Sequence, residues 1–223
     1  MGVFISFCFL LFLGALARAD AYPYVHGMSY LEPLKYDSDF THFDYVDPEA
    51  PRGGTLRFPE LGTFDNFNFM VDKGRRAFAS EILGIRTFTT DSLMQASYDE
   101  PASFYGRLAD GVWISDDYTE FAFRLRTNAI WHDGSPLTVD DVIFSFDHYR
   151  TKGNAGIRTA LRDLGEVKKI GSNEVYFAIK ETAEGNPILP FAVAQFAIQS
   201  KRYWSNLDAT KTTIVPPMGS GPY

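Results

Sequence analysis

The chain has 223 residues, of which 45% are hydrophobic and 16% are aromatic, and its formal net charge is −7. This composition supplies enough apolar side chains for a buried core, which excludes an intrinsically disordered chain. The acidic balance excludes nucleic acid and anionic lipid as main partners, because no basic field is available to collect phosphates.

Residues 1–19 have the pattern of an export signal. An apolar run from Val3 to Ala17 precedes Arg18 and Ala19, and Ala17 and Ala19 are the small residues that a signal peptidase requires. No Lys or Arg precedes the run, so an uncleaved membrane anchor is the alternative. About 15 apolar residues fall short of the ~20 that span a bilayer. We therefore predict a cleaved signal peptide and a periplasmic protein.

The chain contains a single cysteine, Cys8, which lies inside the predicted signal. Its neighbours Phe7 and Phe9 are too large for a lipoprotein signal, so we do not expect a lipid anchor. Once the signal is removed, no cysteine remains to form a disulfide. We expect the exported domain to be held together by its core alone.

Residues 22–52 are rich in Pro, Asp and Tyr without a sustained period, which predicts an extended lead-in lying over a surface. Gly53 and Gly54 then introduce a short predicted strand over residues 55–58, which ends at Pro59 because proline cannot donate to a sheet ladder. Residues 62–68 are expected to form a loop.

The stretch 75–94 carries apolar residues at helical spacing, although Gly84 is unfavourable in a helix. Residues 119–126 instead alternate, with Phe121, Phe123 and Leu125 on one side, which predicts a strand with one buried face. Asp133 and Gly134 predict a turn.

Thr138 and Asp141 have the spacing of a capping box, so we predict a helix from Val139 to about Arg150. Its core face is formed by residues three and four apart, namely Val142, Ile143, Phe146 and Tyr149. Residues 167–170 and 175–179 predict a hairpin, residues 187–195 a helix and residues 201–205 a helical turn. This order of elements indicates a mixed α/β fold.

Two ordered motifs carry a family resemblance. Residues 108–126 and 131–145, which include Trp131-His132-Asp133-Gly134, resemble the signature region of the family 5 extracellular solute-binding proteins, the peptide, nickel and opine receptors of ABC importers. The final Gly219-Ser220-Gly221-Pro222-Tyr223 is similar to a later element of that family. Residues 43–56 and 98–106 resemble the branch that contains the microcin C and oligopeptide receptors.

This resemblance implies a class II periplasmic-binding fold with an extra inserted domain. It suggests a lead-in and start of lobe I over 20–70, an inserted α/β subdomain over 71–195 and a return into lobe I over 196–223. The family continues into a second lobe, so we expect this chain to be an N-terminal fragment with only the first lobe and the insertion. A lone half would expose an apolar face and would tend to aggregate.

A two-lobed receptor binds its ligand between the lobes. In the family that the chain resembles, the loop after the first strand faces this cleft, which points to Gly62, Thr63, Phe64, Asp65 and Asn66 as ligand-binding residues. Phe64 would pack on a ligand side chain, and Asp65 would pair with a ligand ammonium. The alternative is that Asp65 and Asn66 only close a turn.

Enzyme patterns are weak in this sequence. The four histidines show no metal-binding spacing, and there is no nucleophile elbow and no phosphate loop. His42 lies near Asp37, Asp39, Asp44 and Asp47, which could hold a cation but is better explained as solvated charge. We therefore expect no catalytic residue, no metal and no cofactor.

The sequence thus predicts a periplasmic receptor that binds oligopeptides or peptide-like solutes and delivers them to the ABC permease subunits of the inner membrane. It is expected to act as a monomer and to bind no nucleic acid. One alternative is a secreted glycan-active hydrolase with Glu60 and Asp65 as paired carboxylates. Another is a truncated interaction module that binds no solute.

Overall fold

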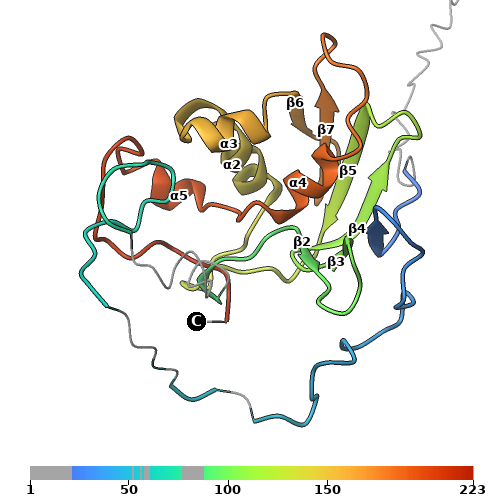
Figure 1. The fold of residues 1–223 in the computed structure, drawn as a ribbon, viewed down its shortest axis with the longest axis horizontal. Coiled ribbons are helices and arrows are strands. Elements are labelled where there is room, and N and C mark those ends of the chain that lie inside the picture. The colour runs from blue at the N-terminus through green and yellow to red at the C-terminus, as the bar shows by residue number, and fades with distance from the viewer. Residues whose placement is uncertain (1–21, 52, 56, 58–60, 77–87, 223) are drawn as a thin grey trace, which may run out of the picture.

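A computed structural model of the protein describes residues 22–51, 53–55, 57, 61–76 and 88–222 (Figure 1). The predicted signal peptide lies outside these residues. Of the predicted strand over 55–58, only Thr55 and Arg57 are described, and neither lies in a strand.

Two antiparallel sheets organise the described chain. The larger sheet contains β4 (Ala109–Ile114), β5 (Glu120–Leu125), β7 (Glu174–Ile179) and β6 (Leu164–Lys169), in that order. The smaller sheet contains β1 (Gly27–Ser29), β3 (Ser103–Gly106) and β2 (Met94–Ala96), in that order. Together with the helices they confirm the predicted mixed α/β architecture.

The predicted helix after the Asp133–Gly134 turn is confirmed as α2 (Val139–Lys152), and it begins with the expected capping box. The Thr138 amide donates to the Asp141 Oδ2 atom at 3.0 Å. Three further helices are short, namely α3 (Ala155–Ala160), α4 (Leu189–Gln195) and α5 (Lys201–Trp204). The predicted hairpin and the two predicted C-terminal helical segments are therefore also confirmed.

The core lies between α2 and the larger sheet, and it is built on aromatic rings. Phe177 of β7 stacks on Phe121 of β5 with ring centroids 5.0 Å apart. Phe146 of α2 meets Phe177 edge to face at 5.1 Å. All three side chains are fully buried, which explains the alternation that predicted β5 and the apolar stripe that predicted α2.

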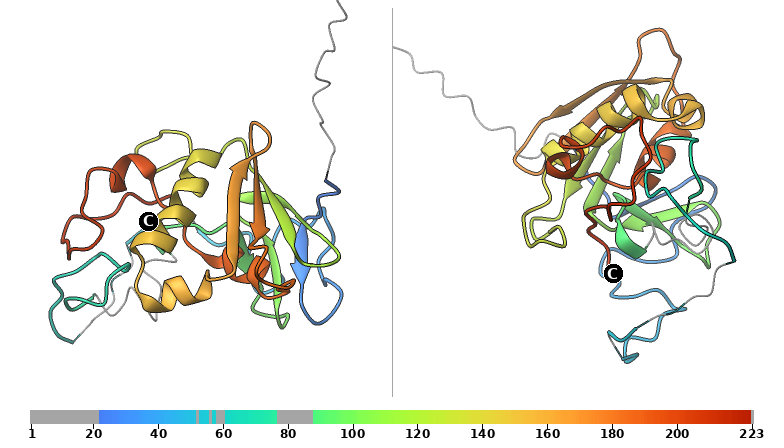
Figure 2. Two further views of the ribbon diagram at one scale, coloured as in Figure 1. Left: turned by 90° about the horizontal axis from the view of Figure 1, so that it is seen from above. Right: turned by 90° about the vertical axis from the view of Figure 1, so that its left-hand side faces the viewer.

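The prediction that β5 has only one buried face was wrong, because Ala122 is as fully buried as its neighbours Phe121 and Phe123. Ala122 lies beside Trp113 of β4 and Tyr176 of β7. Tyr22 of the lead-in packs over this second face, 4.5 Å from Trp113 and 6.5 Å from Tyr176. Figure 2 shows the sheet between α2 on one side and the blue lead-in on the other.

The lead-in is therefore more ordered than its sequence predicted, since it contributes strand β1 to the smaller sheet. Met28 pairs with Phe104 of β3, and Tyr36 is buried against Tyr105 with their rings 5.5 Å apart. Three residues are too short to establish a period of two, so β1 depends on its neighbour and not on its own sequence.

The predicted helix over residues 75–94 is confirmed only at Phe88 and Thr89, because residues 77–87 lie outside the described part. It cannot extend to Met94, where strand β2 begins. In the described ranges, no helix has the length and apolar character needed to cross a bilayer.

Candidate functional site

The five predicted ligand-binding residues lie at the start of a loop over residues 62–76, which we call the site loop. Gly62, Thr63, Phe64 and Asp65 are exposed, and Asn66 is buried. Gly62 has a φ of +121°, a conformation that favours glycine. The loop thus presents four of the five residues to solvent.

The base of the site loop is closed by Asp65. Its amide donates to the Arg75 carbonyl at 2.9 Å, and its Oδ1 atom accepts from the Arg75 amide at 2.6 Å. The chain passes Asp65 at Gly74, which has a φ of +76° and leaves no room for a side chain, because a Cβ atom there would lie 2.6 Å from the Asp65 Oδ1 atom.

Asn66 is held entirely by the protein. Its Oδ1 atom accepts from the amides of Asn68 at 2.7 Å and Thr213 at 3.2 Å, while its Nδ2 atom donates to the carbonyls of Lys73 at 2.8 Å and Asn68 at 3.0 Å. An asparagine amide has two donors and two acceptor positions, and all four are used. The Asn66 side chain therefore closes a turn, as the alternative interpretation of the sequence held, and it fixes the shape of the loop.

Asn68 has a comparable role that the sequence did not reveal. It is fully buried, and its Nδ2 atom donates to the carbonyls of Ala209 at 2.9 Å and Lys211 at 2.8 Å. Its Oδ1 atom accepts from the Met70 amide at 2.9 Å. This side chain ties the site loop to a segment about 140 residues later, and the only local signal for it is a second asparagine in a predicted turn.

The far end of the site loop is tied to helix α3. Asp72 accepts from the Asn154 Nδ2 atom at 2.7 Å and pairs with Arg76 at 3.1 Å. Asn154 is also the N-cap of α3, since its side chain accepts from the Ile157 amide at 3.0 Å. The site loop is therefore fixed at its base, its middle and its end.

Phe64 and Asp65 are two exposed groups on this loop that can contact a ligand. The Phe64 side chain is 50% exposed, and its ring lies 4.9 Å from that of Phe67. The carboxylate of Asp65 retains acceptor positions beyond the one that Arg75 uses. Together they can contact an apolar side chain and accept hydrogen bonds from an ammonium group.

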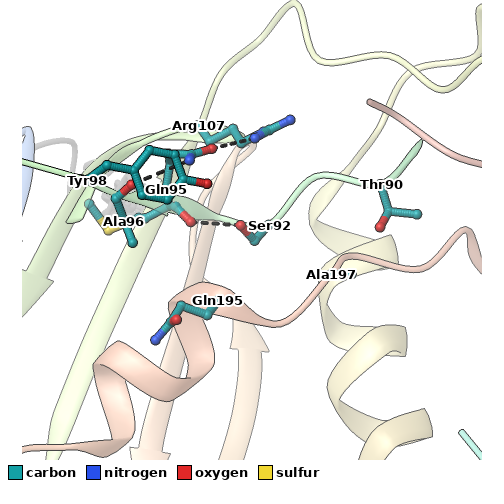
Figure 3. A pocket seen from close by; sticks show the side chains of 9 residues that line it. Thr90, Ser92, Gln95, Ala96, Tyr98, Arg107, Gln195 and Ala197 are labelled. Atoms are coloured by element: carbon teal, nitrogen blue, oxygen red, sulfur yellow. Dashed lines mark hydrogen bonds between the residues drawn. The ribbon is translucent and has the colours of Figure 1, made fainter. Parts of the chain in front are cut away.

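A second polar region lies between β2 and the end of α4. A hollow of about 170 Å³ lies here. Figure 3 shows the side chains of Tyr98, Gln95 and Arg107 on one side of it and Gln195 on the other. Arg107 pairs with Asp91 and donates to the Gln95 Oε1 atom. The Arg107 guanidinium is therefore already engaged by Asp91 and Gln95.

The sequence also suggested two alternative sites, a cation site in the lead-in and a pair of carboxylates. In the lead-in, His42 is bonded to Thr41 at 3.0 Å. No group of three or more side chains that could hold a metal ion occurs in the described ranges, which include Asp37, Asp39, Asp44 and Asp47. Glu60, and with it the predicted carboxylate pair with Asp65, lies outside the described residues.

The comparisons with known proteins agree with the sequence resemblance. The sequence profile of "Bacterial extracellular solute-binding proteins, family 5 Middle" matches residues 103–223. "Uncharacterized protein y4wM" of Sinorhizobium fredii is 39% identical over 96% of this chain and 32% of its own length. "Probable peptide-binding protein YejA" of Agrobacterium fabrum is 36% identical over 88% of this chain and 32% of its own length.

The fold has solved counterparts. The oligopeptide-binding protein AppA of Bacillus subtilis, solved with a nonapeptide, aligns with a TM-score of 0.54 and 24% identity over 72% of this chain and 31% of that protein. The expected class II periplasmic-binding fold is thereby confirmed. The chain spans about a third of the length of the curated relatives that it matches.

Proposed function

This chain belongs to the family 5 bacterial extracellular solute-binding proteins, and from that premise we propose that it is the substrate-binding component of an ABC importer. Members of the family are periplasmic binding proteins. In this proposal the protein binds oligopeptides or peptide-like solutes reversibly and delivers them to the permease subunits of the inner membrane. It carries out no chemical step and acts as a monomer.

The observation that carries the proposal is the family match over residues 103–223, together with a relative that covers most of this chain and is named as peptide-binding. The fixed site loop supports it, because a receptor loses less affinity to ordering when its binding loop is already held in place. No observation favours a glycan-active hydrolase.

We assign ligand contact to the exposed start of the site loop, at Gly62, Thr63, Phe64 and Asp65. Asn66, the fifth predicted residue, belongs to this site through its hydrogen bonds, which hold the loop in shape. Asp65 accepts hydrogen bonds from the terminal ammonium of the peptide, and Phe64 packs against one of its side chains.

We also propose that the protein is exported and that its chain is divided into a signal peptide and three further segments. Residues 1–19 are the signal peptide, removed after Ala19, and residues 20–70, 71–195 and 196–223 form the lead-in, the inserted subdomain and the return into lobe I. The intact mass of the protein from its own host tests the first point. A mature N-terminus at Asp20 is expected, and an N-terminus at Met1 would contradict cleavage.

The binding site is tested by calorimetry with short alanine peptides that carry a free or an acetylated amino terminus. The Asp65→Asn change keeps an oxygen for the Arg75 amide but removes the charge, so affinity for the free peptide is expected to fall about tenfold, as for loss of a charge-assisted hydrogen bond. The exposed Asp116 gives a matched control as Asp116→Asn. Equal affinity in both variants would contradict the assigned role of Asp65.

A further inference from the structure

A second segment of the chain borders the exposed start of the site loop. The Phe67 amide donates to the Thr213 carbonyl at 2.7 Å, and the Thr213 amide donates to the Asn66 Oδ1 atom at 3.2 Å. We call residues 212–215 the companion segment. It is joined to the site loop by direct hydrogen bonds, so its side chains stand next to the residues to which we assign ligand contact.

The two segments run in opposite directions where they meet. Asn68 bonds residues 209 and 211, whereas Asn66, which lies earlier in the chain, bonds the later residue Thr213. Continuing this order toward the start of the site loop brings Asp65 beside the companion segment.

The position of Thr212 confirms that the Asp65 carboxylate borders the companion segment. A Cβ atom on Gly74 would lie 2.6 Å from the Asp65 Oδ1 atom and 2.8 Å from the Thr212 Cγ2 atom. Both atoms therefore border the same small space, which Gly74 leaves free of a side chain. Residue 212 is thus a direct neighbour of the carboxylate.

The hydrogen bonds of Thr213 indicate where the Ile214 side chain lies. The amide and the carbonyl of Thr213 both bond the site loop, as they do in a paired residue of a β-strand. In such an extended backbone, side chains two residues apart point to the same face. Ile214 is therefore placed on the same face as Thr212, which is the side of Asp65.

Ile214 is a large aliphatic side chain that is 69% exposed on a fixed backbone. The Val215 amide donates to the Thr213 Oγ1 atom at 3.1 Å, and the Tyr203 hydroxyl donates to the Val215 carbonyl at 3.0 Å. A ligand that covers Ile214 removes apolar area from water without having to order the backbone that carries it.

The geometry of a peptide decides which of its side chains can reach Ile214. The terminal ammonium and the first side chain branch from the same Cα atom. A peptide whose ammonium is bonded to Asp65 therefore holds its first side chain beside the groups that border this carboxylate. In an extended peptide the second side chain points to the opposite face.

We propose that Ile214 is a specificity-determining residue that contacts the first side chain of the bound peptide and favours an aliphatic one. This inference rests on the proposed function and on the role of Asp65 in it. It adds a selection by side chain to the recognition of the amino terminus.

The test is calorimetry with the tripeptides Leu-Ala-Ala, Ala-Leu-Ala and Ala-Ala-Ala. Burial of the first leucine is expected to make Leu-Ala-Ala bind about fivefold to tenfold more tightly than Ala-Ala-Ala. Ile214→Ala is expected to reduce this preference to about twofold or less, whereas Ile214→Leu, which keeps an aliphatic side chain, retains it. The affinity for Ala-Leu-Ala is expected to change by less than about twofold in both variants.

Ile188→Ala is the matched control, because it removes an isoleucine of comparable exposure, 53%, at the start of α4. It is expected to leave the preference for Leu-Ala-Ala unchanged.

Equal affinity of the wild type for Leu-Ala-Ala and Ala-Ala-Ala would overturn the selection and leave peptide binding in place. A preference that survives Ile214→Ala would assign the selection to another residue. An equal loss for both leucine peptides in Ile214→Ala would show that Ile214 does not select the first position. Binding of none of the three tripeptides would overturn the proposed function and this inference with it.

Discussion

Asn68 contributes more to the site than its position in a turn indicated. Its side chain holds the site loop against residues 209–211 from inside the protein. In this role Asn68 does not contact the ligand itself, but it fixes the positions of Phe64 and Asp65.

Asn68→Ala is expected to destabilise the protein by about 1–3 kcal/mol, because it leaves buried carbonyl and amide groups without partners. Urea unfolding measures the loss, and hydrogen exchange is expected to rise at residues 62–76. The exposed Asn128 provides the control, since Asn128→Ala should change stability by less than about 0.5 kcal/mol. Unchanged exchange in the site loop would contradict the assigned role of Asn68.

His148 of α2 gives the fold a dependence on pH. Burial lowers its pKa below the ordinary value, although the hydrogen bond to Gln199 at 2.6 Å acts in the opposite direction. The unfolded chain therefore binds a proton on this residue more readily than the folded protein does. Stability is then expected to fall as pH drops below about 6.5, the ordinary histidine pKa.

Thermal melts between pH 5.5 and 7.5 test this expectation, with a higher melting temperature at the upper end. The His148→Gln variant is expected to show a smaller rise over the same interval, because its side chain does not titrate. If wild type and variant rise equally, the pH dependence originates from other groups.

The roles of individual residues were predictable from the sequence only where those roles depend on neighbouring residues in the chain. Exposure of Phe64 and Asp65 agrees with a loop rich in turn-forming residues. The engagement of Asn66 with Thr213 and of Asn68 with Ala209 was not predictable, because both partners lie more than 140 residues along the chain. A single sequence gives no signal for such distant pairs.

At the scale of elements, the capping box at the start of α2 also joins two helices. The Asp141 Oδ2 atom accepts from the Thr138 amide, and its Oδ1 atom accepts from the Lys201 amide at the start of α5, each at 3.0 Å. Asp141 as a whole is 8% exposed. Its two oxygens therefore satisfy amides at the starts of two helices.

Asp141→Ala is expected to cost about 2–3 kcal/mol, as the loss of a cap combined with an unpaired amide. Asp140→Ala, one residue earlier and exposed, is expected to cost less than about 1 kcal/mol. Chemical unfolding of both variants provides the comparison, and similar losses would show that Asp141 acts only through its charge near the helix terminus.

The stacked rings between α2 and the larger sheet lead to a further prediction. Phe177 touches Phe121, Phe123 and Phe146 and is fully buried, so Phe177→Ala is expected to cost about 3–5 kcal/mol. Phe64→Ala removes a half-exposed ring and should cost far less. Unfolding curves test both, and a loss below about 1 kcal/mol for Phe177→Ala would contradict the central place of this ring.

Elements with a repeated pattern were predictable, and elements that depend on a neighbour were not. Helix α2 and strand β5 carry apolar residues at clear spacings, and the structure contains both. Strand β1 has three residues and owes its conformation to β3. The second buried face of β5 was missed because Tyr22, which covers it, lies about 100 residues earlier.

At the scale of the whole molecule, the family was predictable from two ordered motifs, and the profile match over residues 103–223 confirms it. The identity of the ligand was not predictable from the sequence. In a two-lobed receptor, half of the groups that hold the ligand come from the other lobe.

Native mass spectrometry of the protein purified from its own host without denaturation tests peptide binding most directly. The expected result is a folded protein carrying a small adduct that is released on denaturation and fragments as a peptide, or that forms when a library of short peptides is added. A protein that carries only a non-peptide solute and takes up no member of the library would contradict the proposed function.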